Sequence, residues 1–177
     1  MLIDIHHARS TVTCATLALV AAAIGNPCWP IEPGTRWTFR ETTPYGEVMR
    51  VVITVTTETK MIANGVDGAQ AGIVMPTDPA PGQAYRQEYF AGEAEDNGQI
   101  VSVTEMADSP FGHFEDVVMT RDTITIEPDV VQFKFYAKGV GPMLVLDVSG
   151  GAGGREELLT VDTVPAGSGL GPLGQPD

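Results

Sequence analysis

Residues 47–61 read EVMRVVITVTTETKM and decide the fold class of this 177-residue chain. Val51, Ile53 and Val55 fall on one side of an extended backbone, and the intervening valine and threonines fall on the other. Runs of β-branched residues with this alternation are typical of a strand, not of a helix. The segment therefore predicts a long β-strand with one face wetter than the other.

Seven further segments on both sides of this one have the same character. They are residues 35–43, 84–91, 99–106, 114–126, 131–138, 142–148 and 156–164. Glycine, proline and asparagine clusters at 44–46, 97–98, 110–112 and 127–129 predict the turns between them. Most connections are too short for crossover helices, which indicates an antiparallel meander. We expect a mainly β protein whose sheet curls into a half-barrel or a barrel, with a sandwich as the second choice.

The N-terminus has the pattern of an export signal. Arg9 precedes the apolar run STVTCATLALVAAAIG at 10–25, which ends in small residues, and Ala23 and Gly25 frame a cleavage site before Asn26. Asp4 weakens the positive flank, and the alternative is an N-terminal helix packed on the core. We therefore expect a signal helix in a signal peptide over 1–25, a single antiparallel β domain over 26–164 and a disordered Gly/Pro tail over 165–177.

The net charge limits which molecules this protein can bind, and the cysteine content limits its disulfides. The chain has 10 basic and 23 acidic residues, for a net charge of −13. Removing residues 1–25 takes away Asp4 and Arg9, and 9 minus 22 is still −13. Such a field disfavours nucleic acid, and the sequence predicts no transmembrane span in the mature chain. Cys14 would be lost with the signal, so Cys28 stands alone and is expected as a small buried apolar residue.

The candidate chemical motifs are few. His113 is the only histidine after residue 25; we expect it at the surface, against the alternative of a general base beside Asp108 or Glu115. Residues 93–100, EAEDNGQI, have part of a calcium-loop pattern but lack its final glutamate, so a solvated acidic turn is expected and no metal site. The glycine run 149–154 precedes a strand pattern, which favours a hairpin loop over a phosphate cradle. No cofactor is predicted.

Four segments carry a resemblance to a known family. They are NPCWPIEPGTRW at 26–37, GVDGAQAGIVMP at 65–76, YRQEYFAGEAED at 85–96 and FYAKGVG at 135–141. They resemble an uncharacterised family of exported bacterial proteins, actinobacterial in type and β-rich. The resemblance implies a curved sheet similar to lipocalins or LolA and assigns no catalytic residue.

This chain departs from that family pattern at one place. Strands that the family has after a segment like 50–61 are missing here, where residues 63–65 join the two parts directly. The chain is therefore expected to be internally shortened. The strand over 47–61 would lose its following partner and either pair with a non-sequential strand or form a homodimer edge.

Large aromatic residues mark the candidate ligand site. The ligand-binding candidates are Trp37, Tyr85, Tyr89, Phe133, Phe135 and Tyr136. We expect a secreted or cell-envelope protein that binds an apolar small molecule or lipid in the hollow of its sheet. One alternative is a β-barrel enzyme, a cyclase or hydrolase, with Glu88, Arg86 or His113 as acid and base. The other is an envelope structural or interaction module without a ligand.

Overall fold

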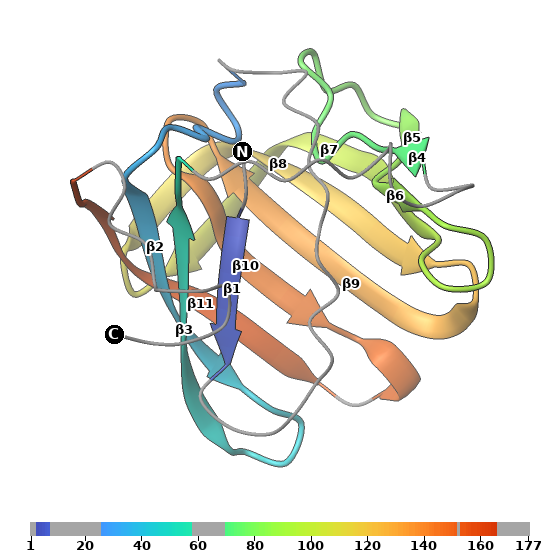
Figure 1. Ribbon diagram of the computed structural model, residues 1–177. Coiled ribbons are helices and arrows are strands. Elements are labelled where there is room, and N and C mark those ends of the chain that lie inside the picture. Colours follow the sequence, from blue (N-terminus) through green and yellow to red (C-terminus); the bar gives the residue numbers. More distant parts are fainter. Residues whose placement is uncertain (1–2, 8–25, 58–69, 152, 166–177) are drawn as a thin grey trace.

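The computed structural model describes residues 3–7, 26–57, 70–151 and 153–165, and β-strands dominate them (Figure 1). The strands are β1 (Ile3–His7), β2 (Thr35–Thr42), β3 (Val48–Val55), β4 (Gln70–Ala71), β5 (Ala84–Arg86), β6 (Glu88–Tyr89), β7 (Asp96–Ser109), β8 (Gly112–Ile124), β9 (Glu127–Ala137), β10 (Gly141–Asp147) and β11 (Gly154–Thr163). A short 3₁₀ turn, η1 (Ser149–Gly151), joins β10 to β11. No helix in this part of the chain is long and apolar enough to cross a membrane.

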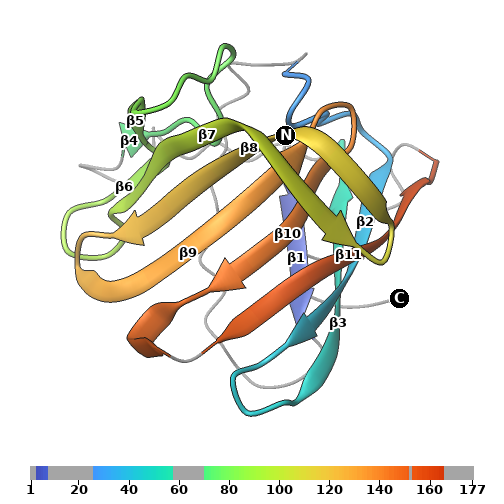
Figure 2. The same ribbon diagram turned by 180° about the vertical axis from the view of Figure 1, so that it is seen from behind.

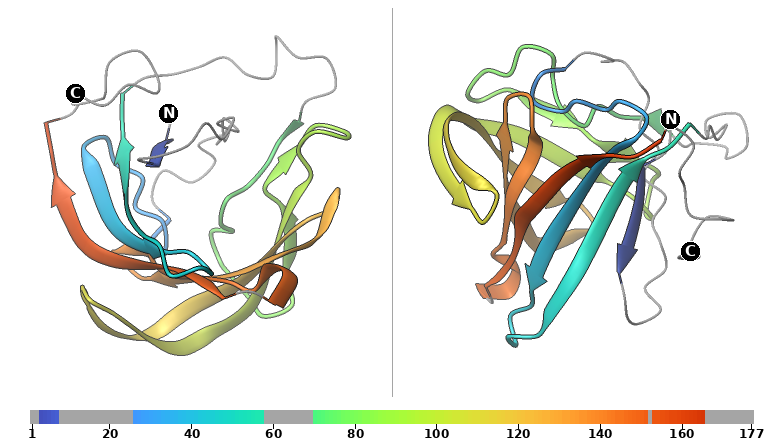
Figure 3. Two further views of the ribbon diagram at one scale, coloured as in Figure 1. Left: turned by 90° about the horizontal axis from the view of Figure 1, so that it is seen from below. Right: turned by 90° about the vertical axis from the view of Figure 1, so that its left-hand side faces the viewer.

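Nine of the strands form one antiparallel sheet in the order β1-β3-β2-β11-β10-β9-β8-β7-β5. Strands β4 and β6 form a separate two-stranded ribbon. Seen from below, the large sheet curves into a U, with an open concave side and a convex side (Figure 3). The two outer strands, β1 and β5, do not pair with each other, so the sheet stays open. The mainly β, antiparallel prediction is confirmed in its half-barrel form.

Each predicted strand segment contributes to this fold, with changes at the ends. Segment 84–91 splits into β5 and β6, and β7 and β8 are longer than predicted. Two predicted turns are wrong. Asn97 and Gly98 lie inside β7, and Pro128 lies near the start of β9, after a turn at 125–126. Asn97-Gly98 has turn chemistry, but pairing with β5 and β8 keeps it extended, whereas Pro128 lies in an irregularity of β9 between the paired residues Glu127 and Val131.

The N-terminal strand gives β3 a second neighbour. Residues Ile3–His7, which the signal prediction placed in the charged flank, pair antiparallel with Val51–Val55, while β2 pairs with the other side of β3. Strand β3 thus pairs with a non-sequential strand of the same sheet, one of the two predicted outcomes. The predicted signal helix at 8–25 and the tail at 166–177 lie outside the described residues.

The larger apolar cluster lies where the β7–β8 hairpin folds back on the sheet. The tip of this hairpin crosses the convex side of β10 and β11 (Figures 2 and 3). The Phe111 amide there donates to the Leu158 carbonyl at 3.0 Å. The cluster contains Trp37, Phe39, Val51, Ile53, Val55, Ala107, Val117, Phe135, Ala137, Met143, Leu144 and Leu158. Burial of these side chains supplies most of the driving force for folding.

The second apolar cluster lines the concave side. It contains Cys28, Met75, Ile100, Val118 and Tyr136, with Trp29, Tyr85 and Val103 packed against it. Irregular segments preceding β2 and β5 supply part of this layer. The Asn26 side chain joins them, because its Nδ2 donates to the carbonyls of Met75 and Pro76 at 3.2 and 3.0 Å. Cys28 is buried, as predicted, and burial raises the pKa of its thiol.

Candidate binding site on the concave face

Neighbouring strands place a row of polar side chains on the concave face. Tyr85 of β5 pairs with Gly98 of β7, and Gly98 pairs with Asp122 of β8. One row along, Thr120 of β8 pairs with Lys134 of β9. Residues directly opposite each other in an antiparallel sheet share a face. The register therefore brings these side chains together beside the second apolar cluster.

Asp122 is the centre of this arrangement and is buried. Its carboxylate accepts hydrogen bonds from Gln87 Nε2 at 2.9 Å and Thr120 Oγ1 at 2.8 Å. Lys134 Nζ lies 2.9 Å from the same carboxylate and balances its charge. A carboxylate has about four lone-pair positions, so three donors leave little capacity for a further partner. We conclude that Asp122 organises the site and is not a free general base.

Tyr85 reaches Asp122 because residue 98 has no side chain. A Cβ on Gly98 would lie 2.5 Å from Tyr85 Cζ and 2.7 Å from its hydroxyl oxygen. Burial, followed by the charge of Asp122, raises the pKa of the Tyr85 hydroxyl. Burial also raises the pKa of Tyr136 well above its usual range, with smaller contributions from Asp122 and Tyr85. Both hydroxyls therefore keep their protons at neutral pH and remain donors.

An aromatic wall continues from this polar row. The ring of Trp29 lies 5.3 Å from that of Tyr136 and 6.4 Å from that of Trp37, both in tilted packing. Trp37 Nε1 donates to the Val140 carbonyl at 2.7 Å. In contrast, Trp29 Nε1 and Tyr85 Oη are buried and have no hydrogen-bond partner of good geometry among the described residues. Buried donors left unpaired are costly, so we expect an acceptor from outside the described residues at this wall.

Two carboxyl groups stand at the margin of the site. The pKa of Glu88 is raised by burial first and by Asp96 second. The pKa of Asp96 is also raised mainly by burial, and Lys134 partly offsets this while Asp122 and Glu127 add to it. The Gln87 amide donates to the Asp96 carbonyl at 2.8 Å, which joins this margin to the Asp122 network. Proton binding at these carboxyls is therefore favoured relative to an exposed acid.

The six predicted ligand residues lie in three places. Tyr136 belongs to the second, concave cluster and Tyr85 packs against it, and Trp37, a member of the larger cluster, contacts their neighbour Trp29. Phe133 and Phe135 lie on the other face of β9, in the register that pairs Phe135 with Leu144, and belong to the larger cluster. Tyr89 lies in the β4–β6 ribbon with the Arg86 guanidinium 4.0 Å from its ring centre. The structure thus brings together three of the six.

The residues named for the enzyme alternative do not meet. His113 is exposed near the tip of the β7–β8 hairpin, with its Nδ1 2.7 Å from an Asp108 oxygen. His113 lies nine positions before Asp122 along β8, which corresponds to about 30 Å of extended chain. Glu88 and Arg86 lie at the Asp122 end, beside β7. His113 with its Asp108 partner is therefore separate from them.

The acidic segment 93–100 comprises a turn and the start of β7, and local hydrogen bonds and one to Thr125 organise it. The Asn97 side-chain amide donates to the Glu95 carbonyl at 3.0 Å and to Thr125 Oγ1 at 2.9 Å, and Glu95 Oε1 accepts from the Gly92 amide at 3.0 Å. Within the described ranges, no three His, Cys, Asp or Glu side chains gather in a way that could hold a metal ion. These side chains act as turn caps.

Sequence reasoning missed Asp122, Thr120, Lys134, Gln87 and Trp29 as site residues. Thr120 and Asp122 alternate along β8, opposite an alternating stretch of β9 that contains Lys134. Polar residues on the same side of two adjacent predicted strands were the available signal. Using that signal requires the register between the two strands, which the sequence alone does not give.

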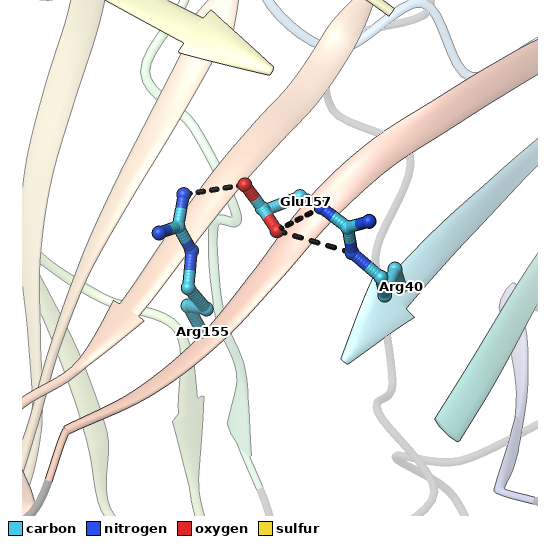
Figure 4. A network of polar contacts seen from close by, with 3 residues as sticks. All are labelled: Arg40, Arg155 and Glu157. Atoms are coloured by element: carbon cyan, nitrogen blue, oxygen red, sulfur yellow. Dashed lines mark hydrogen bonds and ion pairs between the residues drawn. The ribbon is translucent and has the colours of Figure 1, made fainter. Parts of the chain in front are cut away.

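A second polar network lies on the opposite face and is separate from this site. Figure 4 shows Glu157 of β11 between Arg40 of β2 and Arg155. Glu157 Oε2 accepts from Arg40 Nη2 at 2.7 Å, and Oε1 accepts from Arg155 Nη2. Glu157 pairs with Leu144, which places it in the row of Phe135. The two guanidiniums compensate the charge of the buried Glu157 carboxylate.

Comparisons with known proteins give one distant similarity. No protein-family model matches the chain, and no curated protein matches it. Among solved structures, a protein from Bacteroides fragilis with a YmcC-like fold matches 76% of this chain and 98% of its own chain, with 14% identity and a TM-score of 0.46. The export of that protein is itself an inference, according to its description. A similarity at this level carries no conclusion about function, so the family resemblance, including its actinobacterial type, stays a prediction.

Proposed function

We propose that this chain is an exported protein that binds an amphipathic small molecule or lipid on the concave face of its sheet. The observation that carries the proposal is the buried Trp29 Nε1 donor, which has no hydrogen-bond partner among the described residues and lies in the same apolar cluster as Tyr85, whose buried hydroxyl has only a poorly aligned contact with Gln87. An apolar ligand body would pack on the aromatic side chains. An acceptor oxygen of the ligand would satisfy one or both donors.

The electrostatics of the face favour an uncharged polar group on that ligand. Asp122 is neutralised by Lys134, so the deepest carboxylate leaves no free negative charge. Glu88 and Asp96 at the margin hold their protons more tightly than exposed acids do. A carbonyl, ether or hydroxyl oxygen fits these surroundings better than a carboxylate, which the net charge of −13 would also repel.

Native mass spectrometry of the protein recovered from outside the producing cell tests the proposal. We expect the native mass to exceed that of the polypeptide, and the bound molecule to be released unchanged on denaturation. Tyr85→Phe should lower its occupancy because it removes the buried hydroxyl and keeps the ring. Tyr89→Phe is the matched control, since Tyr89 lies in the β4–β6 ribbon. A protein that carries no added mass in any form would contradict the binding proposal.

The enzyme alternative has one specific observation in its favour. Glu88 and Asp96 are neighbouring carboxyls whose pKa values burial raises, and such groups are suited to proton transfer. The two functions differ in what leaves the protein. A binding protein releases the molecule that it took up, whereas an enzyme releases a changed one, and Glu88→Gln would abolish that change.

Export is tested separately. Sequencing the N-terminus of the recovered protein should give Asn26 as the first residue, as the signal pattern predicts. Recovery of the chain only inside the cell, with Met1 retained, would contradict export and would leave the binding test intact.

A further inference from the structure

The two edges of the large sheet are built differently. Beyond Ile100, β7 pairs within the sheet only with β8, and its register with β8 shifts three times before Ser109. Bulges of this kind twist an edge and discourage pairing with another chain. Strand β3, which lies next to the outermost strand β1 at the other end, runs against β2 with no register shift from Arg36↔Thr54 to Thr42↔Val48. The regular edge is therefore that of β3.

The outward edge of β3 also lacks chemical protection. Its residues Val51–Val55 read VVITV, with no charge, proline or glycine. Val51 and Val55 are almost completely buried in the larger cluster, so the strand is firmly held in position. A regular, uncharged, rigid edge is the geometry that accepts an added strand.

In the unprocessed chain this edge is occupied by β1. Five residues, Ile3–His7, pair with Val55–Val51 in one unbroken antiparallel register (Figure 1). These residues belong to the predicted signal peptide, so the step that exports the protein would also remove the strand. Removal of β1 in the mature protein therefore rests on the proposed export. After cleavage, the sheet would end at β3 with its backbone N–H and C=O groups unpaired on one side.

We infer that the β3 edge is a strand-acceptor site, which residues 3–7 occupy before processing and which β3 of a second copy occupies afterwards. Antiparallel pairing about a two-fold axis allows Ile53 to face the partner's Ile53, with Val51 opposite the partner's Val55. This register keeps the one charged residue of β3, Arg50, away from the partner's Arg50. The two curved sheets would become one continuous sheet.

The test uses the full chain with residues 1–25 retained, so it does not depend on cleavage. In Asp4→Pro/Ile5→Pro, two consecutive prolines remove at least one N–H that points to β3, because successive residues of a strand direct their N–H groups to opposite sides. The matched control, Asp4→Ala/Ile5→Ala, keeps both N–H groups. Sedimentation equilibrium and hydrogen exchange at Val51–Val55 are measured over a range of protein concentrations.

We expect the full chain and the alanine control to be monomers with slow exchange at Val51–Val55 at every concentration. The proline variant should dimerise, with protection of the same amides only where the dimer is populated. Adding Val52→Lys to it should return it to a monomer, because a charge then stands on the edge. A proline variant that stays monomeric, whether its β3 amides exchange fast or slowly, would overturn the inference, and N-terminal sequencing separately decides the export on which it rests.

Discussion

Replacing Gly98 by alanine tests the packing of the concave site directly. The new Cβ would lie 2.5 Å from Tyr85 Cζ, whereas non-bonded carbons prefer about 3.5–4.0 Å. The rigid tyrosine ring would therefore have to move by about 1 Å, away from its place beside Asp122. Overpacking of this kind costs about 1–3 kcal/mol, and the gain from replacing a strand glycine returns about 0.5–1 kcal/mol.

The net loss is therefore up to about 2.5 kcal/mol, which for a chain of this length lowers the Tm by up to about 10 °C. Differential scanning calorimetry measures it. Gly153→Ala is the matched control, because a Cβ there meets nothing within 4 Å, and its Tm should stay almost unchanged. In a Tyr85→Ala background the Gly98→Ala penalty should disappear. An equal penalty in both backgrounds, or a higher Tm for the single variant, would refute the packing that we describe.

Four further predictions concern charge, metal and processing. Lys134→Met leaves the buried Asp122 carboxylate without its cation and should destabilise the protein by about 3–5 kcal/mol, measured by urea denaturation; an unchanged midpoint would contradict the buried pair. Because the folded-state pKa of Glu88 is raised above 4.5, stability is lost as pH rises through and above that value, so Glu88→Gln should raise the Tm at pH 7 and leave it nearly unchanged at pH 4. Millimolar calcium should not change the Tm, since Glu95 acts as a turn cap, and a rise of several degrees would indicate a metal site. Ala23→Arg should block processing, seen as retention of the precursor on immunoblots.

The alternation of side chains made the strands predictable. Segment 47–61 shows this best, because β-branched residues on alternate positions have one good conformation, and the structure has β3 at Val48–Val55. Short connections then favoured neighbouring antiparallel strands, as found for β8, β9 and β10. The burial of Cys28 was likewise a matter of local composition. Each of these conclusions depends on residues close together in the chain.

Tertiary contacts decided the conformation of residues that are compatible with both a turn and a strand. Asn97-Gly98 is a favourable turn sequence, yet it lies inside β7, where the missing side chain of Gly98 admits the ring of Tyr85. Alternation predicts that Phe133 and Phe135 share the face of β9 opposite Tyr136, but only the tertiary structure decided that this face packs in the larger cluster, away from the Asp122 site.

The sequence by itself determined where most of the strands lie and which side chains of a strand share a face. Only the tertiary structure decided which strands are neighbours and in what register. The Asp122 site depends on that register, because Tyr85, Gly98, Asp122 and Lys134 come from four strands. So does the pairing of Ile3–His7 with β3. Side-chain alternation is a local property of the backbone, whereas register is set by the sum of contacts across the whole sheet.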